Sequence, residues 1–163
     1  MKIVDNIFSE QELETIRQEY RESLKLGRWE INKFLWQENL TIHHRGQVLM
    51  FNVEKDEIYD IVIPKIGQYM QFEGEPNIAF YLWNEGSGIG WHCDDHVKQA
   101  CTIYLNDWPL ERGGQLVYKE NNQNRLIPVI SNRCVINDSQ TEHQVTTVRR
   151  SNELRCTIQM FIR

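Results

Sequence analysis

The chain has 163 residues and a mass of 19.5 kDa, with 40% hydrophobic and 25% charged residues, which fits one globular domain. This composition excludes a disordered or fibrous protein. The formal net charge of −5 argues against a nucleic-acid partner, because phosphate binding depends on clustered lysine and arginine.

No apolar run approaches the length of about 18 residues that a membrane span needs. The first residues, MKIVDNIFSEQELE, become acidic before the apolar region of a signal peptide could form. We therefore predict a cytoplasmic protein without a membrane partner. The cysteines at positions 93, 101, 134 and 156 form no CxxC pair and are expected to be reduced packing residues.

Two helices are predicted in the first half of the chain. Ser9 and Glu12 form a capping-box pattern, and apolar residues then recur at helical spacing until Gly27. A second helical stretch spans about residues 55–72, although Pro64 argues against an uninterrupted helix there. Residues 1–75 are thus expected to provide helical support and substrate-facing loops.

From Pro76 onward, short runs rich in β-branched and aromatic residues alternate with turn clusters such as GSG and ENNQN. They predict strands near residues 77–83, 90–94, 99–105, 114–119, 125–129, 132–137, 143–148 and 154–162. Helices followed by strands predict a mostly β fold, a sandwich or barrel with the helices packed on one sheet.

The last predicted strand has two different faces. Leu154, Cys156, Ile158, Met160 and Ile162 point one way, and Arg155, Thr157, Gln159 and Phe161 point the other. The second face either lines a polar interior that holds a charged ligand or meets solvent. A buried arginine needs an anionic partner, which is a ligand carboxylate or an internal acidic residue.

The segment GWHCDDH contains the candidate metal ligands His92 and Asp94. Two positions apart on a strand, they would leave the same face, and His143 begins a later strand that can lie opposite them. Two imidazoles and one carboxylate leave open positions on an octahedral ion, which favours iron(II) over zinc. A His-x-Asp pair alone is weakly specific, and the plain alternative is a turn of polar residues.

Four segments in order resemble the 2-oxoglutarate and iron(II)-dependent dioxygenases, in particular their prolyl-hydroxylase-like branch. They are YLWNEGSGIGWHCDD, ACTIYLNDWPLERGGQLVY, NRCVINDSQTEHQVTTV and LRCTIQMF. The resemblance covers the carboxy-terminal half, from about residue 77 to the end. It implies a double-stranded β-helix, or jelly roll, with its core over residues 76–163 of a single domain of residues 1–163. It implies iron(II), 2-oxoglutarate and dioxygen as cofactor and co-substrates, with ascorbate as a further reductant.

The resemblance also assigns roles to individual residues. His92, Asp94 and His143 match the iron ligands, and Arg155 and Tyr104 match residues that bind the distal carboxylate of 2-oxoglutarate. The hydroxyl of Thr157 is a further candidate for that carboxylate. Either Tyr81 or Trp83 is expected to line the co-substrate pocket, at a position where relatives commonly have tyrosine.

Several rivals to these assignments remain. Asp95 would replace Asp94 as ligand if a bulge intervened, His96 is expected at the rim of the site, and Arg149 is the alternative to Arg155. Gly113 and Gly114 predict a turn that opens a strand. Substrate specificity is expected in loops 27–47, 85–91 and 107–113.

The resemblance implies an enzyme that hydroxylates a C–H bond of a prolyl residue in a peptide or protein, or of a free amino acid. The carboxylate of Asp94 argues against halogenation, because similar halogenases lack it. Two alternatives remain: a non-catalytic jelly roll that binds a metal or ligand, and a nucleic-acid demethylase of the same superfamily.

Overall fold

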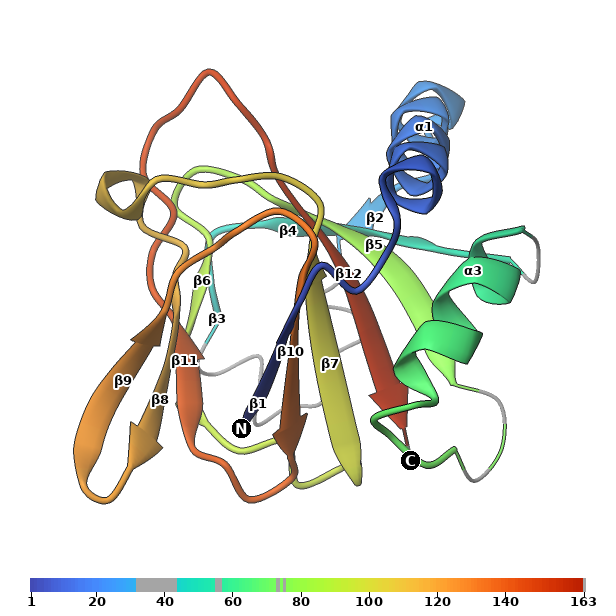
Figure 1. Cartoon of the computed structure of the whole chain (residues 1–163). Coiled ribbons are helices and arrows are strands. Elements are labelled where there is room, and N and C mark those ends of the chain that lie inside the picture. The colour runs from blue at the N-terminus through green and yellow to red at the C-terminus, as the bar shows by residue number, and fades with distance from the viewer. Residues whose placement is uncertain (32–43, 55–56, 73, 75, 163) are drawn as a thin grey trace.

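A computed structural model of the protein describes residues 1–31, 44–54, 57–72, 74 and 76–162 (Figure 1). Residues 32–43 of the predicted specificity loop 27–47 lie outside the described residues. The helices are α1 (Glu10–Leu26), α3 (Glu57–Ile66) and the short 3-10 helix η2 (Leu110–Arg112). The strands are β1 (Lys2–Asp5), β2 (Glu30–Ile31), β3 (His44–Arg45), β4 (Val48–Asn52), β5 (Asn77–Trp83), β6 (Gly88–His92), β7 (Gln99–Tyr104), β8 (Leu116–Glu120), β9 (Gln123–Ile127), β10 (Arg133–Asp138), β11 (His143–Val145) and β12 (Arg155–Ile162).

Within the described residues, the strands form two antiparallel sheets. The larger sheet has seven strands in the order β1-β10-β7-β12-β5-β4-β2, and the smaller has five in the order β3-β6-β11-β8-β9. In Figure 1, α1 and α3 lie on the outer side of the larger sheet, away from β8, β9 and β11. This arrangement confirms the predicted mostly β fold with helices packed on one sheet.

The helix α1 begins and ends as the sequence predicts. The Ser9 side chain accepts the Glu12 amide, and the Glu12 carboxylate accepts the Ser9 amide, so two otherwise unpaired N–H groups are satisfied. At the other end, Gly27 has a φ of 65°, a left-handed conformation that glycine adopts without steric cost. The apolar face between these caps, including Leu13, Ile16 and Tyr20, is buried.

Two hydrophobic cores lie on opposite faces of the larger sheet. The outer core packs α1 and α3 against Ile78, Phe80, Ile103 and Ile158. The inner core lies between the two sheets and contains Val48, Met50, Tyr81, Trp83, Tyr104, Leu116, Val135 and Val145. Because side chains alternate along a strand, each central strand contributes to both cores.

The polar face of β12 belongs to the inner core. Arg155, Thr157 and Gln159 are 1%, 0% and 8% exposed. The alternative that this face meets solvent is therefore wrong, because β12 is a central strand with the smaller sheet above its inner face. Leu154, expected on the apolar face of the strand, is instead exposed and precedes β12.

The first half of the chain holds more strands than the sequence predicts. β1 pairs with β10, and β4 pairs with β5, so both extend the larger sheet. The second helix is shorter than predicted, because α3 ends at Ile66, two residues after Pro64. Proline provides no amide hydrogen for the helix and crowds the carbonyl four residues earlier, which explains the early end.

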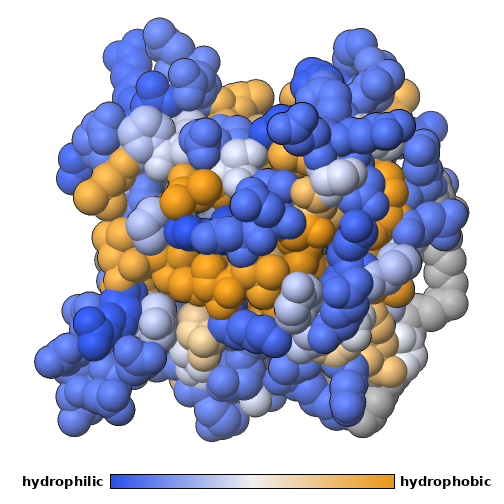
Figure 2. All heavy atoms as spheres, viewed as in Figure 1, coloured by the Kyte–Doolittle hydropathy of each residue, from blue (hydrophilic) through white to orange (hydrophobic). Residues whose placement is uncertain are grey.

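Figure 2 shows hydrophobic side chains in a band across the middle of this face of the molecule, surrounded by hydrophilic side chains. The four cysteines are free thiols, and Cys101 and Cys134 are buried, as predicted for packing residues. No helix in the described part of the chain is long and apolar enough to cross a lipid bilayer.

Candidate metal centre

His92 and His143 come from neighbouring strands of the smaller sheet. His92 is the last residue of β6, and His143 is the first residue of β11. The strands are antiparallel, and these two residues are paired directly across them. The sheet register therefore brings together two imidazoles that are distant in the sequence.

The register of β6 shifts just before His92. His143 pairs with His92 but Val145 pairs with Ile89, so β6 has an extra residue in this interval. Such a bulge breaks the alternation of side chains. As a result, both Ile89 and His92 face the inside, where Ile89 joins the inner core and His92 lies beside Asp94.

Asp94 lies beyond the end of β6, in a turn whose Asp94 carbonyl accepts the Val97 amide at 3.1 Å. The expectation that His92 and Asp94 share one face of a strand over residues 90–94 is therefore wrong. The chain leaves the sheet after His92, and the turn returns the Asp94 side chain toward the two histidines. The residues meet as expected, but for a different reason.

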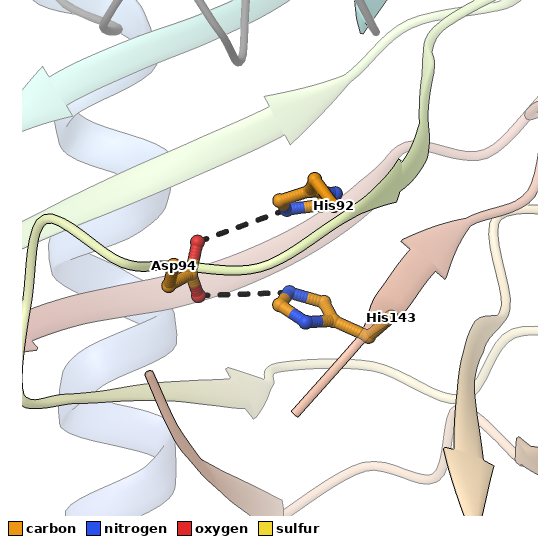
Figure 3. Close-up of side chains that lie close together, drawn as sticks. All are labelled: His92, Asp94 and His143. Carbon is orange, nitrogen blue, oxygen red and sulfur yellow. Dashed lines mark ion pairs between the residues drawn. The ribbon is translucent and has the colours of Figure 1, made fainter. Parts of the chain in front are cut away.

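The three side chains surround one point (Figure 3). One ligand atom from each of His92, Asp94 and His143 lies within 4.8 Å of the others. The Nε2 atoms of His92 and His143 are 3.7 and 3.5 Å from the carboxylate oxygens Oδ1 and Oδ2 of Asp94. Asp94 and His143 are buried, so this group can bind a metal ion in a site shielded from water.

Backbone carbonyls orient both imidazoles. Nδ1 of His92 lies 2.8 Å from the Gly90 carbonyl, and Nδ1 of His143 lies 2.8 Å from the Thr141 carbonyl. A carbonyl can only accept, so Nδ1 carries a hydrogen in both rings. In the neutral form that binds metals, the lone pair of each ring is therefore on Nε2, which faces Asp94.

Asn137, a residue that the sequence analysis did not select, holds the carboxylate. Its amide nitrogen donates to Oδ2 of Asp94 at 2.9 Å, and its side chain comes from the inner face of β10. This bond links the larger sheet to the metal-binding group. The only signal in the sequence was a polar residue at an inward position of a predicted core strand.

Arg155 is the largest fully buried side chain, and two of its nitrogens lack partners. Nε and Nη1 of Arg155 and the hydroxyl of Tyr104 are buried without a hydrogen-bond partner among the described residues. The guanidinium carbon lies 4.8 Å from the ring centre of Trp83 and 5.5 Å from that of Tyr104. Unpaired buried donors of this kind are costly and fit an anionic ligand.

Burial has opposite effects on these two groups. Loss of solvation lowers the pKa of Arg155 to about 10, because it disfavours the charged form. Loss of solvation also raises the pKa of Tyr104, an effect that the nearby charge of Arg155 partly offsets. At neutral pH the pair therefore presents a positive charge and a neutral hydroxyl donor.

Trp83, Thr157 and Tyr81 lie beside Arg155 on the inner face of the larger sheet. Trp83 is paired with Arg155 across β5 and β12, and Tyr81 is paired with Thr157. The indole nitrogen of Trp83 donates to the hydroxyl of Thr157 at 3.2 Å. Both aromatic residues belong to the inner core. The structure therefore excludes neither of the two candidates for lining the co-substrate pocket.

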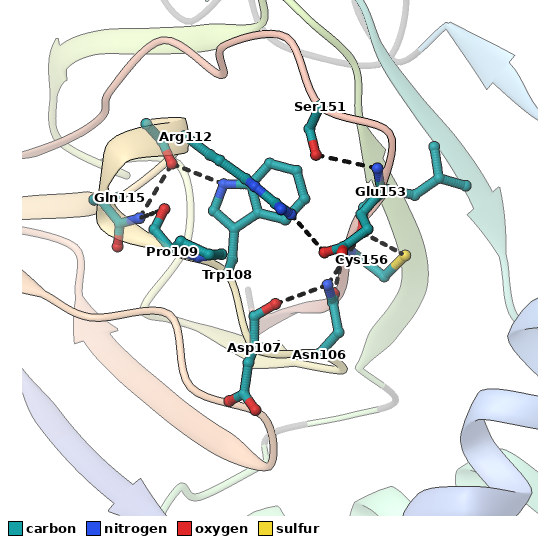
Figure 4. A network of polar contacts seen from close by, with 11 residues as sticks. Asn106, Asp107, Trp108, Pro109, Arg112, Gln115, Ser151, Glu153 and Cys156 are labelled. Atoms are coloured by element: carbon teal, nitrogen blue, oxygen red, sulfur yellow. Dashed lines mark hydrogen bonds and ion pairs between the residues drawn. The ribbon is translucent and has the colours of Figure 1, made fainter.

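The loop around Asn106 and the turn at Gly114 both contact the segment around Arg155. Figure 4 shows Asn106 beside Cys156, the residue that follows Arg155. The Asn106 side chain donates to the Leu154 carbonyl and accepts the Cys156 amide, each at 3.1 Å, so it fixes the residues on both sides of Arg155. Gly114 has a φ of 70°, and an added Cβ would lie 2.8 Å from Cδ of Arg155. A side chain at position 114 would therefore displace the guanidinium.

The rival residues lie outside the metal-binding group. Asp95 is exposed, and His96 is not part of the group that surrounds His92, Asp94 and His143. Arg149 is exposed and donates to the Glu111 carbonyl, so it does not enter the inner core. As predicted, Gly113 and Gly114 form a turn, and β8 begins two residues later.

Comparison with known families decides the assignment. Residues 76–163, more than half of the chain, match the model of the 2OG-Fe(II) oxygenase superfamily. The chain belongs to this superfamily. Its members use iron(II) and 2-oxoglutarate, as the sequence resemblance implied. No curated protein matches the sequence of this oxygenase.

Solved structures agree with the fold of this oxygenase. A prolyl-4-hydroxylase from Pseudomonas putida has a TM-score of 0.75 at 18% identity, covering 99% of this chain and 91% of its own. A prolyl hydroxylase from Trichoplax adhaerens, solved with a hypoxia-inducible-factor peptide, has a TM-score of 0.75 at 20% identity (98% and 81% coverage). The epimerase SnoN from nogalamycin biosynthesis has a TM-score of 0.73 at 14% identity (98% and 75%). These matches confirm the jelly-roll fold.

The residues present in the oxygenase fit both groups that the superfamily uses. Two neutral imidazoles and one carboxylate form a set that suits iron(II) and leaves positions open. The unpaired donors of Arg155 and Tyr104 suit the carboxylate of a keto acid. The metal-binding group and these donors both face the space between the two sheets.

Proposed function

We propose that the chain, acting as a single domain, is a 2-oxoglutarate-dependent hydroxylase whose iron(II) is bound by His92, Asp94 and His143. The observation that carries this proposal is the convergence of these three side chains from β6, the following turn and β11. The carbonyls of Gly90 and Thr141 support it, because they orient both imidazoles with Nε2 toward one point.

We further propose that Arg155, Tyr104 and Thr157 hold the distal carboxylate of 2-oxoglutarate. The buried guanidinium provides charge, and the hydroxyl of Tyr104 provides a neutral donor, both without competing partners in the described residues. A carboxylate would complete the hydrogen bonds of these groups, which gains most in a site with little water. Tyr81 forms an apolar wall beside them.

When bound, iron(II), 2-oxoglutarate and dioxygen supply the oxidation, which couples decarboxylation of the keto acid to succinate with hydroxylation of a C–H bond. The protein residues bind and orient these groups and keep bulk water away. Asn137 holds the Asp94 carboxylate, and the inner core of aromatic and β-branched residues surrounds Arg155.

We propose a prolyl residue in a peptide or protein, or a free amino acid, as the first substrate class to test. Two similar structures are named as prolyl hydroxylases, and one of them holds a peptide. Another is an epimerase, so the fold accommodates more than one outcome. The net charge of −5 does not favour a nucleic-acid substrate.

The test measures succinate with iron(II), 2-oxoglutarate and ascorbate, in the presence of proline-containing peptides and free amino acids. Mass spectrometry then identifies a product that has gained one oxygen atom. We expect succinate in every productive reaction and hydroxylation of at least one member of the panel. A wild-type protein that binds metal but never forms succinate would instead be a non-catalytic binding module.

Variants of the site sharpen this test. We expect His92→Ala, Asp94→Ala and His143→Ala each to abolish succinate formation, whereas His96→Ala, a nearby histidine outside the group, retains it. Arg155→Ala should raise the concentration of 2-oxoglutarate required and retain metal binding. Arg149→Ala should change neither the required concentration of 2-oxoglutarate nor metal binding. Full turnover in any of the three alanine variants would refute the ligand assignment.

A further inference from the structure

Trp83 occupies an unusual place beside the proposed carboxylate site. It lies directly opposite Arg155 in the pairing of β5 and β12, and it is 3% exposed. Its indole nitrogen reaches diagonally to Thr157, the next inward residue of β12. One side chain therefore contacts two of the three residues that we propose to bind the carboxylate.

The hydrogen bonds of Thr157 determine what its hydroxyl can do. An indole N–H only donates, so the hydroxyl oxygen of Thr157 must accept from Trp83 at 3.2 Å. The Gln159 amide donates to the same oxygen at 3.4 Å, and the Gln159 carbonyl accepts the hydroxyl of Thr102 at 2.8 Å. Two donors thus occupy both lone pairs of the Thr157 hydroxyl oxygen.

The hydroxyl hydrogen of Thr157 remains available. No bond donated by Thr157 is found among the described residues, and Thr157 is 0% exposed to bulk solvent. Across the strand, Thr157 is paired with Tyr104, whose hydroxyl is also unpaired. The free hydrogens of Arg155, Tyr104 and Thr157 are therefore gathered in one region.

We propose that Trp83 is a positioning residue that binds no ligand itself and acts on 2-oxoglutarate through Thr157 and Arg155. Its N–H occupies a lone pair of Thr157, which makes that hydroxyl a donor toward the distal carboxylate. Its ring face, 4.8 Å from the guanidinium carbon, supports Arg155 in a cation–π contact. This inference rests on the proposed function, because it assumes that a keto-acid carboxylate binds here.

The experiment measures the dissociation constant of 2-oxoglutarate by calorimetry, with Mn(II) in place of iron so that no turnover occurs. Thr157→Val removes the donor and should weaken binding by about tenfold or more, the usual effect of losing a hydrogen bond to a charged group. Thr157→Ser keeps the hydroxyl and should retain most of the affinity. Trp83→Phe keeps an aromatic face but loses the N–H, and should weaken binding by roughly two- to tenfold.

A double-mutant cycle separates this role from simple packing. If Trp83 acts through Thr157, the N–H has no effect once the hydroxyl is gone, so Trp83→Phe/Thr157→Val should bind as Thr157→Val does. If the two substitutions instead cause independent packing defects, their fold-losses in affinity should multiply in the double variant. Trp29→Phe is the matched control, because Trp29 packs on the outer core near Phe51, and it should leave the affinity unchanged.

Three outcomes overturn the inference: unchanged affinity in Trp83→Phe, multiplicative losses in the cycle, or unchanged affinity in Thr157→Val. The last would mean that the Gln159 amide has the opposite orientation and that its oxygen takes the Thr157 hydrogen. Circular dichroism and thermal melts confirm that each variant is folded. If the wild-type protein binds Mn(II) but not 2-oxoglutarate, the proposed function itself fails, which is a different result.

Discussion

At the scale of single residues, Asn137 determines how Asp94 presents its carboxylate. The amide holds Oδ2 at 2.9 Å, while Oδ1 faces Nε2 of His92. Asn137 and Asp94 are both about 5% exposed, so water does not replace this bond if it is lost. A carboxylate without its donor would be free to rotate away from the histidines.

We therefore predict that Asn137→Leu lowers the affinity for Mn(II) or iron(II) by roughly 10- to 100-fold, the usual effect of losing an outer partner of a metal ligand. Titration of each protein with the metal in a calorimeter measures this change in affinity. Asn124→Leu, on the exposed strand β9, is the control and should bind as the wild-type protein does. Equal affinities in Asn137→Leu and wild type would show that the amide has no positioning role.

The sequence predicted which side chains come together better than it predicted how they do so. His92, Asp94 and His143 could be proposed because metal chemistry limits the residue types and the resemblance limits the positions. Their contacts depend on a bulge in β6 and on a turn after it, which follow from pairing with β11. Asn137 was missed, and Gly114 was predicted only as part of a turn, because their roles arise from residues that contact them only in the folded chain.

At the scale of elements, β1 is held to the edge of the larger sheet by one ion pair as well as by its backbone. Arg133 on β10 donates through Nε and Nη2 to both carboxylate oxygens of Asp5, at 2.6 and 2.9 Å. This hydrogen bonding lowers the pKa of Asp5 below its usual value and raises the pKa of Arg133. The Asp5 side chain is 52% exposed, so solvent screens the pair and its contribution is about 1 kcal/mol or less.

The sign of the pH dependence follows from the lowered pKa. Ionised Asp5 stabilises the folded state, so its contribution is complete above the unfolded pKa of about 4 and is lost as the pH falls through the folded value. We predict that Asp5→Asn is less stable than wild type in urea at pH 6 and that the difference disappears as the pH falls below the lowered pKa of Asp5. Glu19→Gln on α1 is the control. A difference that stays constant down to the lowest pH would contradict this role for Asp5.

Helices and strands could be predicted where the sequence pattern was long, and the prediction failed where the pattern was short. The capping box of α1, the apolar and aromatic run of β5 and the alternation in β12 gave bounds close to those observed. β1 has four residues, and β4 is a continuous apolar run, VLMFN, that periodicity alone does not distinguish from helix. Both become strands because β10 and β5 offer them a sheet edge.

At the scale of the whole molecule, the proposed metal and co-substrate sites join the two sheets. The metal-binding group lies on the smaller sheet and contacts Asn137 on the larger, whereas Arg155 lies on the larger sheet beneath the turn at Gly114. Ligands that bind between the sheets should therefore stabilise the entire fold. Only ligands with higher affinity for the folded chain have this effect.

We predict that Mn(II) and 2-oxoglutarate each raise the melting temperature and that together, at about 100 times their dissociation constants, they raise it by roughly 5–10 °C or more. His143→Ala should lose both increments, whereas Arg155→Ala should lose only that of 2-oxoglutarate. Differential scanning fluorimetry measures these melting temperatures, with protein in a metal chelator as the ligand-free reference. An Arg155→Ala protein that keeps the whole increment of 2-oxoglutarate would refute the assigned carboxylate site.

The cross-strand pairing of His92 with His143 also has a consequence for biosynthesis. While β11 is still inside the ribosome, the nascent chain lacks one imidazole, and β6 lacks the neighbour that fixes its irregular register. Iron binding at the proposed site must then wait until β11 has been translated and docked. Loading of the metal at this site is thus a late event in maturation.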